Sequence, residues 1–249
     1  MKNLEDHKKI AVLIDADNAQ HSKLKDILNE LSAQGHLVVK KAYGDWSKEY
    51  LKNWKTSLNE LAIQPVQQFA YTTGKNSTDA SMIIDAMDLL YTKQFDAFAL
   101  VSSDSDFTRL AARLRESEVF VFGVGEEKTP VSFRNACDDF ILTENLGKVA
   151  VAPEVPVAVP NMPKAVKPVH DELLELILNA WELTKDDDGY ANLGGVGNVM
   201  KRQKPDFDPR TYGAQKLSEL IGRYPKVFLK KKISYDSGGT GYSIKVSKQ

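Results

Sequence analysis

Apolar and polar residues alternate in blocks along residues 9–143, and the lengths of the blocks suit strands and helices in turn. Short apolar runs rich in β-branched residues predict buried strands. The segments between them carry apolar residues at helical spacing. Strands that alternate with helices in this way predict an α/β fold built on a parallel sheet. The strands are expected at 9–15, 36–43, 62–69, 96–103, 118–124 and 138–142, and the helices at 19–34, 47–60, 78–93 and 106–117.

The chain changes character after residue 148. Five prolines, separated by small or β-branched residues, fall within VAVAPEVPVAVPNMPKAVKP, which predicts an extended linker with polyproline character. From residue 170 the pattern predicts an amphipathic helix (HDELLELILNAWELT), a polar turn and two shorter helical segments. A β-hairpin follows, with its two strands joined by the turn DSGGTG. The length of 249 residues also favours two domains. We therefore expect a domain at 1–148, a linker at 149–169 and an α+β domain at 170–249.

Composition excludes several classes of protein. The single cysteine, Cys137, rules out an internal disulfide framework and a thiolate zinc cluster, and it is expected to be a small buried hydrophobe. The four histidines are scattered without metal-ligand spacing. No apolar run approaches the length of a membrane span, and the first ten residues lack the apolar centre of a signal peptide. We expect a cytoplasmic protein that does not enter a membrane.

Aspartates stand at three of the predicted strand-to-helix junctions. Asp15 ends the first apolar run, and Asp79 opens the helix SMIIDAM. Asp104 and Asp106 follow the strand DAFALVSS. Residues just past the carboxyl ends of the strands line the ligand crevice of an open α/β sheet, so these acids are expected on one rim. Such carboxylates would repel one another without a divalent cation, and hard cations take oxygen ligands. The pattern predicts a Mg²⁺ or Mn²⁺ site.

Each acid also has a structural explanation. Asp17 or Asn18 could cap the helix after the first strand. An acid in the first helical turn, such as Asp79, is favoured by the helix dipole in any protein. One of Asp104 and Asp106 is expected to be the N-cap of the next helix, and Asp106 is the preferred choice. The coincidence of acids at three junctions therefore argues more strongly for a metal site than any one of them.

Two further acids and a lysine lie close to Asp79 in the sequence. At about 100° per residue, Asp85 and Asp88 lie roughly 240° and 180° around the helix from Asp79, so they should not share its face. Asp88 is expected to be solvated, and Asp85 is a secondary candidate. Lys75 lies in a polar loop before the helix, where it could meet a phosphate or remain an ordinary solvated lysine.

Three ordered motifs make residues 9–146 resemble an NYN domain of the LabA-like branch of the PIN-like nucleases. IDADN matches the opening D-x-x-N motif of the family, STDASMIIDAM its helix motif, and LVSSDSDF its S-x-D-x-D-F signature. The resemblance implies a Rossmannoid parallel sheet flanked by helices and a metal-dependent nuclease activity. It also implies that Asn18 orients the site and that the metal-binding acids are Asp15, Asp79, Asp104 and Asp106.

Two serines complete this resemblance. The segment SFRNACDDFI resembles the closing segment of the family, which implies that Ser132 lies near the pocket and contacts RNA. Ser103 stands where many relatives have glycine. This departure could restrict the approach of backbone to a phosphate.

Residues 170–246 resemble an OST-HTH (LOTUS) domain, a small winged-helix-like module of proteins that handle RNA. The matching stretch is DGYANLGGVGNVMKRQKPDFDPRTYGAQKLSELI. Cationic and aromatic residues here suit contact with backbone phosphates, although exposed lysines on any domain would give the same pattern. Recognition of a protein partner is the other role open to this module. The RNA-contacting residues expected are Lys201, Arg202, Arg210, Lys230, Lys231 and Lys232.

Together these observations predict a metal-dependent endoribonuclease that acts on single-stranded RNA. Two alternatives stay open. In a haloacid-dehalogenase-type phosphatase, Asp15 would be the nucleophile and Asp17 the acid, but Asn18 stands where that family has Thr or Val, and no cap insertion interrupts the sheet. In an RNA-binding or scaffold protein, the acidic pocket would have lost its catalytic role.

Overall fold

The computed structural model describes residues 8–69, 77–147, 169–234 and 240–247. The chain divides into two compact units, Met1–Gly147 and Lys148–Gln249. The linker expected at 149–169 lies almost entirely outside the described residues. Among the helices that the structure describes, none has the length and apolar content needed to cross a membrane.

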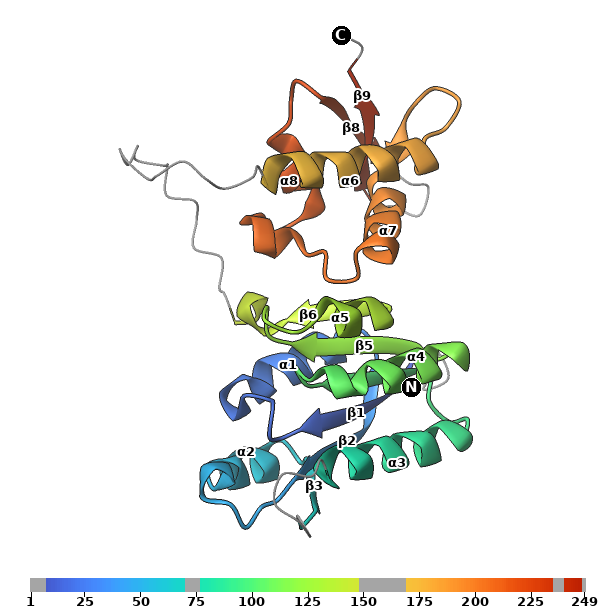
Figure 1. Ribbon diagram of the computed structural model, residues 1–249. Coiled ribbons are helices and arrows are strands. Elements are labelled where there is room, and N and C mark those ends of the chain that lie inside the picture. The colour runs from blue at the N-terminus through green and yellow to red at the C-terminus, as the bar shows by residue number, and fades with distance from the viewer. Residues whose placement is uncertain (1–7, 70–76, 148–168, 235–239, 248–249) are drawn as a thin grey trace, which may run out of the picture. The chain divides into compact units, whose positions relative to one another are not determined.

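Six parallel strands form the sheet of the first unit, as the apolar runs predict (Figure 1). The strand order is β3-β2-β1-β4-β5-β6, so the chain moves outward in one direction from β1 and then in the other from β4. The carboxyl ends of β1 and β4 therefore meet at a topological switch point, where α/β proteins bind ligands. The strands are β1 (Lys9–Asp15), β2 (His36–Gly44), β3 (Gln64–Gln67), β4 (Ala97–Val101), β5 (Phe120–Gly125) and β6 (Asp139–Leu142).

Helices cover both faces of this sheet, and an apolar core fills each interface. Helices α1 (Leu24–Ser32) and α2 (Trp54–Glu60) pack on one face. Helices α3 (Ser77–Tyr91), α4 (Thr108–Glu116) and α5 (Val131–Ala136) pack on the other. Strands β1, β4, β5 and β6 are almost entirely buried, which explains why their sequences are almost continuously apolar. The edge strand β3 is largely exposed, and β2 is buried only toward its carboxyl end. Cys137 lies in the second of these cores, 1% exposed, as expected.

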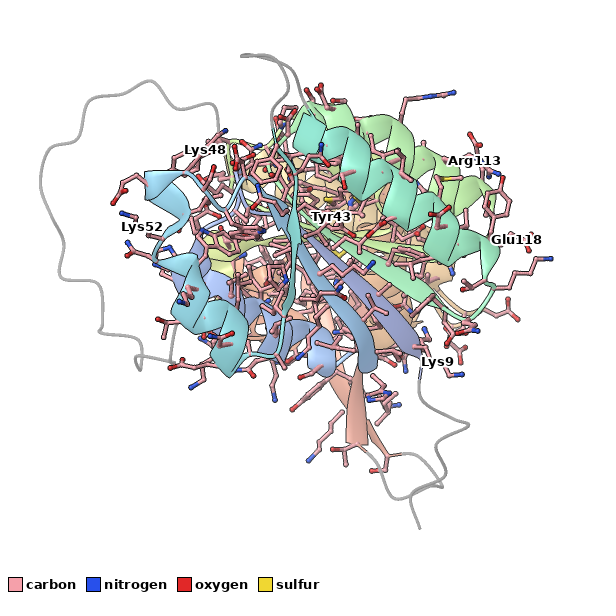
Figure 2. All side chains as sticks on the ribbon, turned by 90° about the horizontal axis from the view of Figure 1, so that it is seen from below. Lys9, Tyr43, Lys48, Lys52, Arg113 and Glu118 are labelled. Carbon is pink, nitrogen blue, oxygen red and sulfur yellow. The ribbon has the colours of Figure 1, made fainter. Side chains whose placement is uncertain are left out.

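Short 3₁₀ helices precede or follow the regular elements. They are η2 (His21–Lys23), η3 (Glu49–Leu51), η4 (Ser105–Phe107) and η5 (Thr143–Asn145). The amino and carboxyl ends of the parallel strands lie on opposite sides in Figure 2. Lys48, just after the carboxyl end of β2, is on the opposite side from Lys9, at the start of β1. We call the side of Asp15 and Lys48 the carboxyl edge.

The second unit combines helices with a small antiparallel sheet, in agreement with the α+β prediction. Its three strands are ordered β7-β9-β8, so β8 is an edge strand, and one apolar core joins them to the helices. The elements are α6 (Val169–Thr184), β7 (Ala191–Asn192), α7 (Leu193–Gln203), η6 (Pro209–Tyr212), α8 (Leu217–Gly222), β8 (Phe228–Ser234) and β9 (Thr240–Val246).

Candidate metal centre at the carboxyl edge

Three of the predicted acids meet at the carboxyl edge. One carboxylate oxygen from each of Asp79, Asp104 and Asp106 lies within 4.8 Å of the others. Asp79 comes from the first turn of α3, whereas Asp104 and Asp106 follow β4. Asp79 and Asp104 are half-buried and Asp106 is exposed. The fold thus assembles one group of oxygen ligands from two separate strand-to-helix junctions.

Asp15 is completely buried at the end of β1 and is tied to this group through Ser102. The Ser102 hydroxyl donates to Asp15 Oδ2 at 2.7 Å and accepts from the backbone N–H of Asp104 at 3.0 Å. Asn18 Nδ2 also donates to Asp15 Oδ2, at 2.9 Å. Burial raises the pKa of Asp15, while the bonds from Ser102 and Asn18 lower it and so favour the charged form. Asp15 thus lies next to the acid group without being one of its three members.

The electrostatic environment of Asp79 shows how strongly the carboxylates interact. Burial and, after it, the negative charges of its neighbours together raise its pKa from 3.8 to about 6. Those neighbours, in order of decreasing effect, are Asp15, Asp104, Asp106 and Asp17. A divalent cation among them would relieve this repulsion, and carboxylate oxygens are the ligands that Mg²⁺ and Mn²⁺ prefer. The residues present therefore fit such an ion.

The N-cap prediction for Asp106 is wrong, because Asp104 has that role. Asp104 Oδ1 accepts the backbone N–H of Asp106 at 3.0 Å, and Asp104 has the extended backbone of a cap residue. The helix begins earlier than expected, with the 3₁₀ turn η4 ahead of α4, so the cap moves two residues toward the N-terminus. This bond fixes the orientation of the Asp104 carboxylate.

Asp85 serves the fold at a distance from the acid group. Its Oδ2 accepts from Lys41 Nζ at 2.7 Å and from the Tyr43 hydroxyl at 2.9 Å, which ties α3 to β2. Burial and the Asp85 carboxylate raise the pKa of Tyr43 well above its usual value. Asp88 is exposed, as predicted.

Sequence analysis missed two residues on the β2 side of the site. Tyr50, in η3, donates from its hydroxyl to Asp17 Oδ1 at 2.6 Å. Lys48 Nζ lies 3.3 Å from the same hydroxyl, to which it donates. Both residues follow the carboxyl end of β2, so the rule that singled out the aspartates could have found them too. They were not predicted because the pattern at the strand ends was interpreted only for acidic residues, and neither of these two is acidic.

Ser103 has a structural explanation. Its hydroxyl accepts the backbone N–H of Glu126 at 2.9 Å and so joins the end of β4 to the residue after β5. Ser132 is exposed in α5, a helix of six residues that sequence analysis did not expect. Its place in the site stays a prediction. Lys75 lies outside the described residues.

The three lysines of β8, Lys230, Lys231 and Lys232, are exposed, but they divide between the two faces of the sheet. Lys231 lies opposite Ser243 in β9, and Lys230 lies opposite the buried Ile244. Because neighbouring residues of a strand point to opposite faces, Lys230 and Lys232 share one face and Lys231 occupies the other. The three lysines therefore do not form one continuous surface.

Aromatic rings lie beside these lysines on both faces. Lys231 Nζ is 5.5 Å from the centre of the Tyr190 ring, and Lys245 Nζ is 5.1 Å from the same centre. On the other face, Lys230 Nζ is 5.0 Å from the Tyr242 ring. These distances are those of cation–π pairs.

The remaining basic candidates differ in their surroundings. Lys201 and Arg202 are exposed in the last turn of α7. The Arg210 guanidinium instead binds the Asp208 carboxylate, with Nη2 2.8 Å and Nε 2.9 Å from Oδ2. Since Asp208 offsets its charge, Arg210 is a weaker candidate for phosphate contact than the two residues of α7.

Comparison with known proteins supports the motif resemblances. Residues 9–144 match the family model of the NYN domain, and residues 164–237 match that of the OST-HTH/LOTUS domain. No curated protein matches the chain at a significant level.

Two solved structures are similar to parts of the chain. A protein of unknown function from Vibrio parahaemolyticus RIMD 2210633 is 19% identical with a TM-score of 0.46, over 55% of this chain and 94% of that one. An uncharacterized protein from Nitrosomonas europaea is 27% identical with a TM-score of 0.29, over 41% of this chain and 94% of that one.

An NYN domain implies a PIN-like nuclease, and an OST-HTH domain implies an RNA-binding module. The NYN match spans the whole six-stranded sheet and the acid group at its carboxyl edge. The protein therefore belongs to the NYN domain family, and an OST-HTH/LOTUS domain follows its NYN domain.

Proposed function

We propose that this protein is a metal-dependent endoribonuclease that hydrolyses phosphodiester bonds in single-stranded RNA. The observation that carries the proposal is the convergence of three carboxylates within 4.8 Å at the carboxyl edge of the sheet. Burial and the negative charges of the neighbouring carboxylates raise the pKa of Asp79. Such repulsion suits a site made to receive a cation.

Asp79, Asp104 and Asp106 would hold Mg²⁺ or Mn²⁺. When bound, the ion would lower the pKa of a coordinated water and offset the negative charge that develops on the phosphate. The N-cap bond orients Asp104, and Ser102 holds Asp15 and the Asp104 backbone together. Asn18 orients Asp15 from the other side. These supporting bonds would keep the carboxylates in place as the substrate binds.

The preference for RNA comes from the OST-HTH domain, which implies an RNA-binding module. Lysines beside aromatic rings suit contact with phosphates and unstacked bases. Lys231 and Lys245 around Tyr190, and Lys201 with Arg202, are the positions that we assign to this contact. A single strand would enter the carboxyl edge more easily than a duplex, because its bases are accessible.

Incubation of the purified protein with labelled single-stranded RNA tests the proposal, with Mn²⁺ in one arm and a chelator in the other. We expect cleavage only with Mn²⁺, and cleavage of a circular RNA as well, because an endonuclease needs no free end. A generic phosphomonoester is the third substrate. Turnover of the phosphomonoester without RNA cleavage would favour the phosphatase, and RNA binding without turnover of either substrate would favour the non-catalytic scaffold.

A further inference from the structure

A large aromatic side chain is exposed beside the acid group. Tyr50 is 58% exposed, yet its hydroxyl is held by Asp17 at 2.6 Å. The backbone N–H of Asp17 donates to Asp15 Oδ1 at 3.1 Å, so Asp17 lies beside the buried acid at the end of β1. Tyr50 is therefore both accessible to a large ligand and linked to the site.

The second observation is a cation on the same flank. Lys48 Nζ lies 3.3 Å from the Tyr50 hydroxyl and 5.6 Å from the centre of its ring. Figure 2 shows Lys48 and Lys52 on the same side of the first unit. Lys52 forms an ion pair with Glu49, so part of its charge is offset, and the pair is exposed. Lys48 therefore places positive charge beside Tyr50 and Asp17, at the edge that carries the acid group.

A phosphate chain approaching this edge would meet repulsion from the acids. Lys48 would attract a phosphate there, and the Tyr50 ring would offer its surface to the adjoining base. Aromatic rings stack with every base, because every base has a π-face. Phe69, which follows β3 and is 59% exposed, adds a second ring at the carboxyl edge in the direction away from the acids.

We infer that Tyr50 and Lys48 form a nucleotide subsite in which a base of single-stranded RNA stacks on Tyr50 and a backbone phosphate contacts Lys48. The inference rests on the proposed ribonuclease function and adds a positioning role for two residues outside the metal ligands. The Tyr50–Asp17 hydrogen bond restrains the ring before RNA binds, so less side-chain freedom is lost on binding.

Photocrosslinking tests the subsite without requiring catalysis. The full-length protein would be irradiated with a short single-stranded RNA that carries 4-thiouridine, with Ca²⁺ in place of Mg²⁺ or Mn²⁺. Trypsin cleaves after Lys48 and Lys52, so a crosslink to Tyr50 should appear on the four-residue peptide EYLK. We expect this crosslink in the wild type and its loss in Tyr50→Ala. Crosslinks confined to other peptides would overturn the subsite.

Kinetic measurements on variants of Tyr50 distinguish a role in stacking on a base from a role in holding the Asp17 side chain. Tyr50→Ala should raise KM for RNA about 10-fold with a smaller effect on kcat, in line with the loss of one stacked base. Tyr50→Phe keeps the ring and loses the hydrogen bond, so its KM should stay within about twofold of the wild-type value. A Tyr50→Phe variant as impaired as Tyr50→Ala would show that Tyr50 acts only through Asp17, and would overturn the inference.

Tyr91 provides the matched control. It is 70% exposed and ends α3, which begins at the carboxyl edge and returns the chain to the start of β4. Tyr91→Ala should leave both the crosslink and KM unchanged. Cleavage without a crosslink to EYLK would reject the subsite and retain the nuclease, whereas a crosslink without cleavage would retain the subsite and reject the nuclease.

Discussion

The two units hold their charged side chains in different ways. At the carboxyl edge of the NYN domain, Asp15 is buried, Asp79 and Asp104 are half-buried, and hydrogen bonds from Ser102 and Asn18 fix the arrangement. In the OST-HTH domain, the lysines of β8 are exposed and lie on both faces of an edge strand. The carboxylates of the first arrangement are partly buried and repel one another, whereas water solvates the lysines of the second.

This difference affects how much each arrangement says about function. Burying Asp79 among other carboxylates raises the free energy of the folded state, as its pKa of about 6 shows. A stable protein retains such a cluster where a ligand compensates for it. Exposed lysines carry no such penalty, because water solvates them. The metal site is therefore the more sharply defined proposal, and the following variants test both sides of the comparison.

The largest effect is expected from Asp104→Asn. Asparagine keeps the N-cap bond to the Asp106 backbone, because it is as good a cap as aspartate, but it removes one ligand charge. RNA cleavage with Mn²⁺ should fall by at least about 100-fold, since even residues that only support a ligand account for 10- to 100-fold. Asp88→Asn is the control, because Asp88 is exposed on the same protein and lies outside the acid group. Equal cleavage rates for the two variants would contradict the metal assignment.

Ser102→Ala should have the next largest effect. The change removes a hydrogen bond to buried Asp15 and another from the Asp104 backbone. We expect Mn²⁺ affinity and cleavage to fall about 10-fold, as for other groups that orient ligands. Ser105→Ala, at an exposed serine of η4, should match the wild type. A wild-type titration curve for Ser102→Ala would show that the bridge plays no part in the site.

Substitution of the three lysines of β8 should have a moderate, salt-dependent effect on RNA binding. Changing Lys230, Lys231 and Lys232 together to Ala should weaken RNA binding and lower the slope of log K against log salt by up to about 2, at about 0.7 per lost phosphate contact. The control changes Lys8, Lys25 and Lys93 of the first unit, which are also exposed, and so removes the same total charge. Equal losses from both sets would point to net charge alone, and no loss from either would favour a protein partner for this domain.

The smallest effect concerns stability without metal. Asp79→Asn removes a charge from among other carboxylates, so the metal-free variant should melt about 1–3 °C above the wild type at pH 8. Folding raises the pKa of Asp79 from 3.8 to about 6, so its charge destabilises the folded state above that range. The difference in Tm should shrink as the pH falls toward 4, where Asp79 is protonated in the folded state and about half protonated in the unfolded state. Calorimetry at the two pH values measures it, and a variant that melts lower at pH 8 would contradict the repulsion.

The sequence was sufficient for the elements whose burial leaves a clear pattern. Strands β1, β4, β5 and β6 are buried, so their apolar runs predicted their positions and, with the helices between them, the parallel sheet. Helix α5 was missed because six residues are too few for helical spacing to emerge. Strand β7 was missed for a similar reason, since its two residues form a strand only by pairing with β9.

The metal ligands of the candidate site could be predicted from the sequence, but the residues that support them could not. Position after a strand picks out Asp15, Asp79 and Asp104, because the rule depends on topology alone. The N-cap was misplaced because the extra 3₁₀ turn depends on local hydrogen bonding. The same rule reaches the position of Tyr50 after β2, but the bonds that Ser102 and Tyr50 make to Asp15 and Asp17 join segments far apart in the chain. Sequence spacing gives no information on such contacts.

Titration of the metal-free protein with Mn²⁺ by isothermal calorimetry tests the central claim most directly, because it needs neither the correct RNA nor turnover. We expect the wild type and Asp88→Asn to bind Mn²⁺ with the same affinity, and Asp104→Asn to bind at least about 10-fold more weakly. Thermal melts of the same samples should show Mn²⁺ stabilising only the proteins that bind it. Equal Mn²⁺ affinity for the wild type and Asp104→Asn would contradict the account.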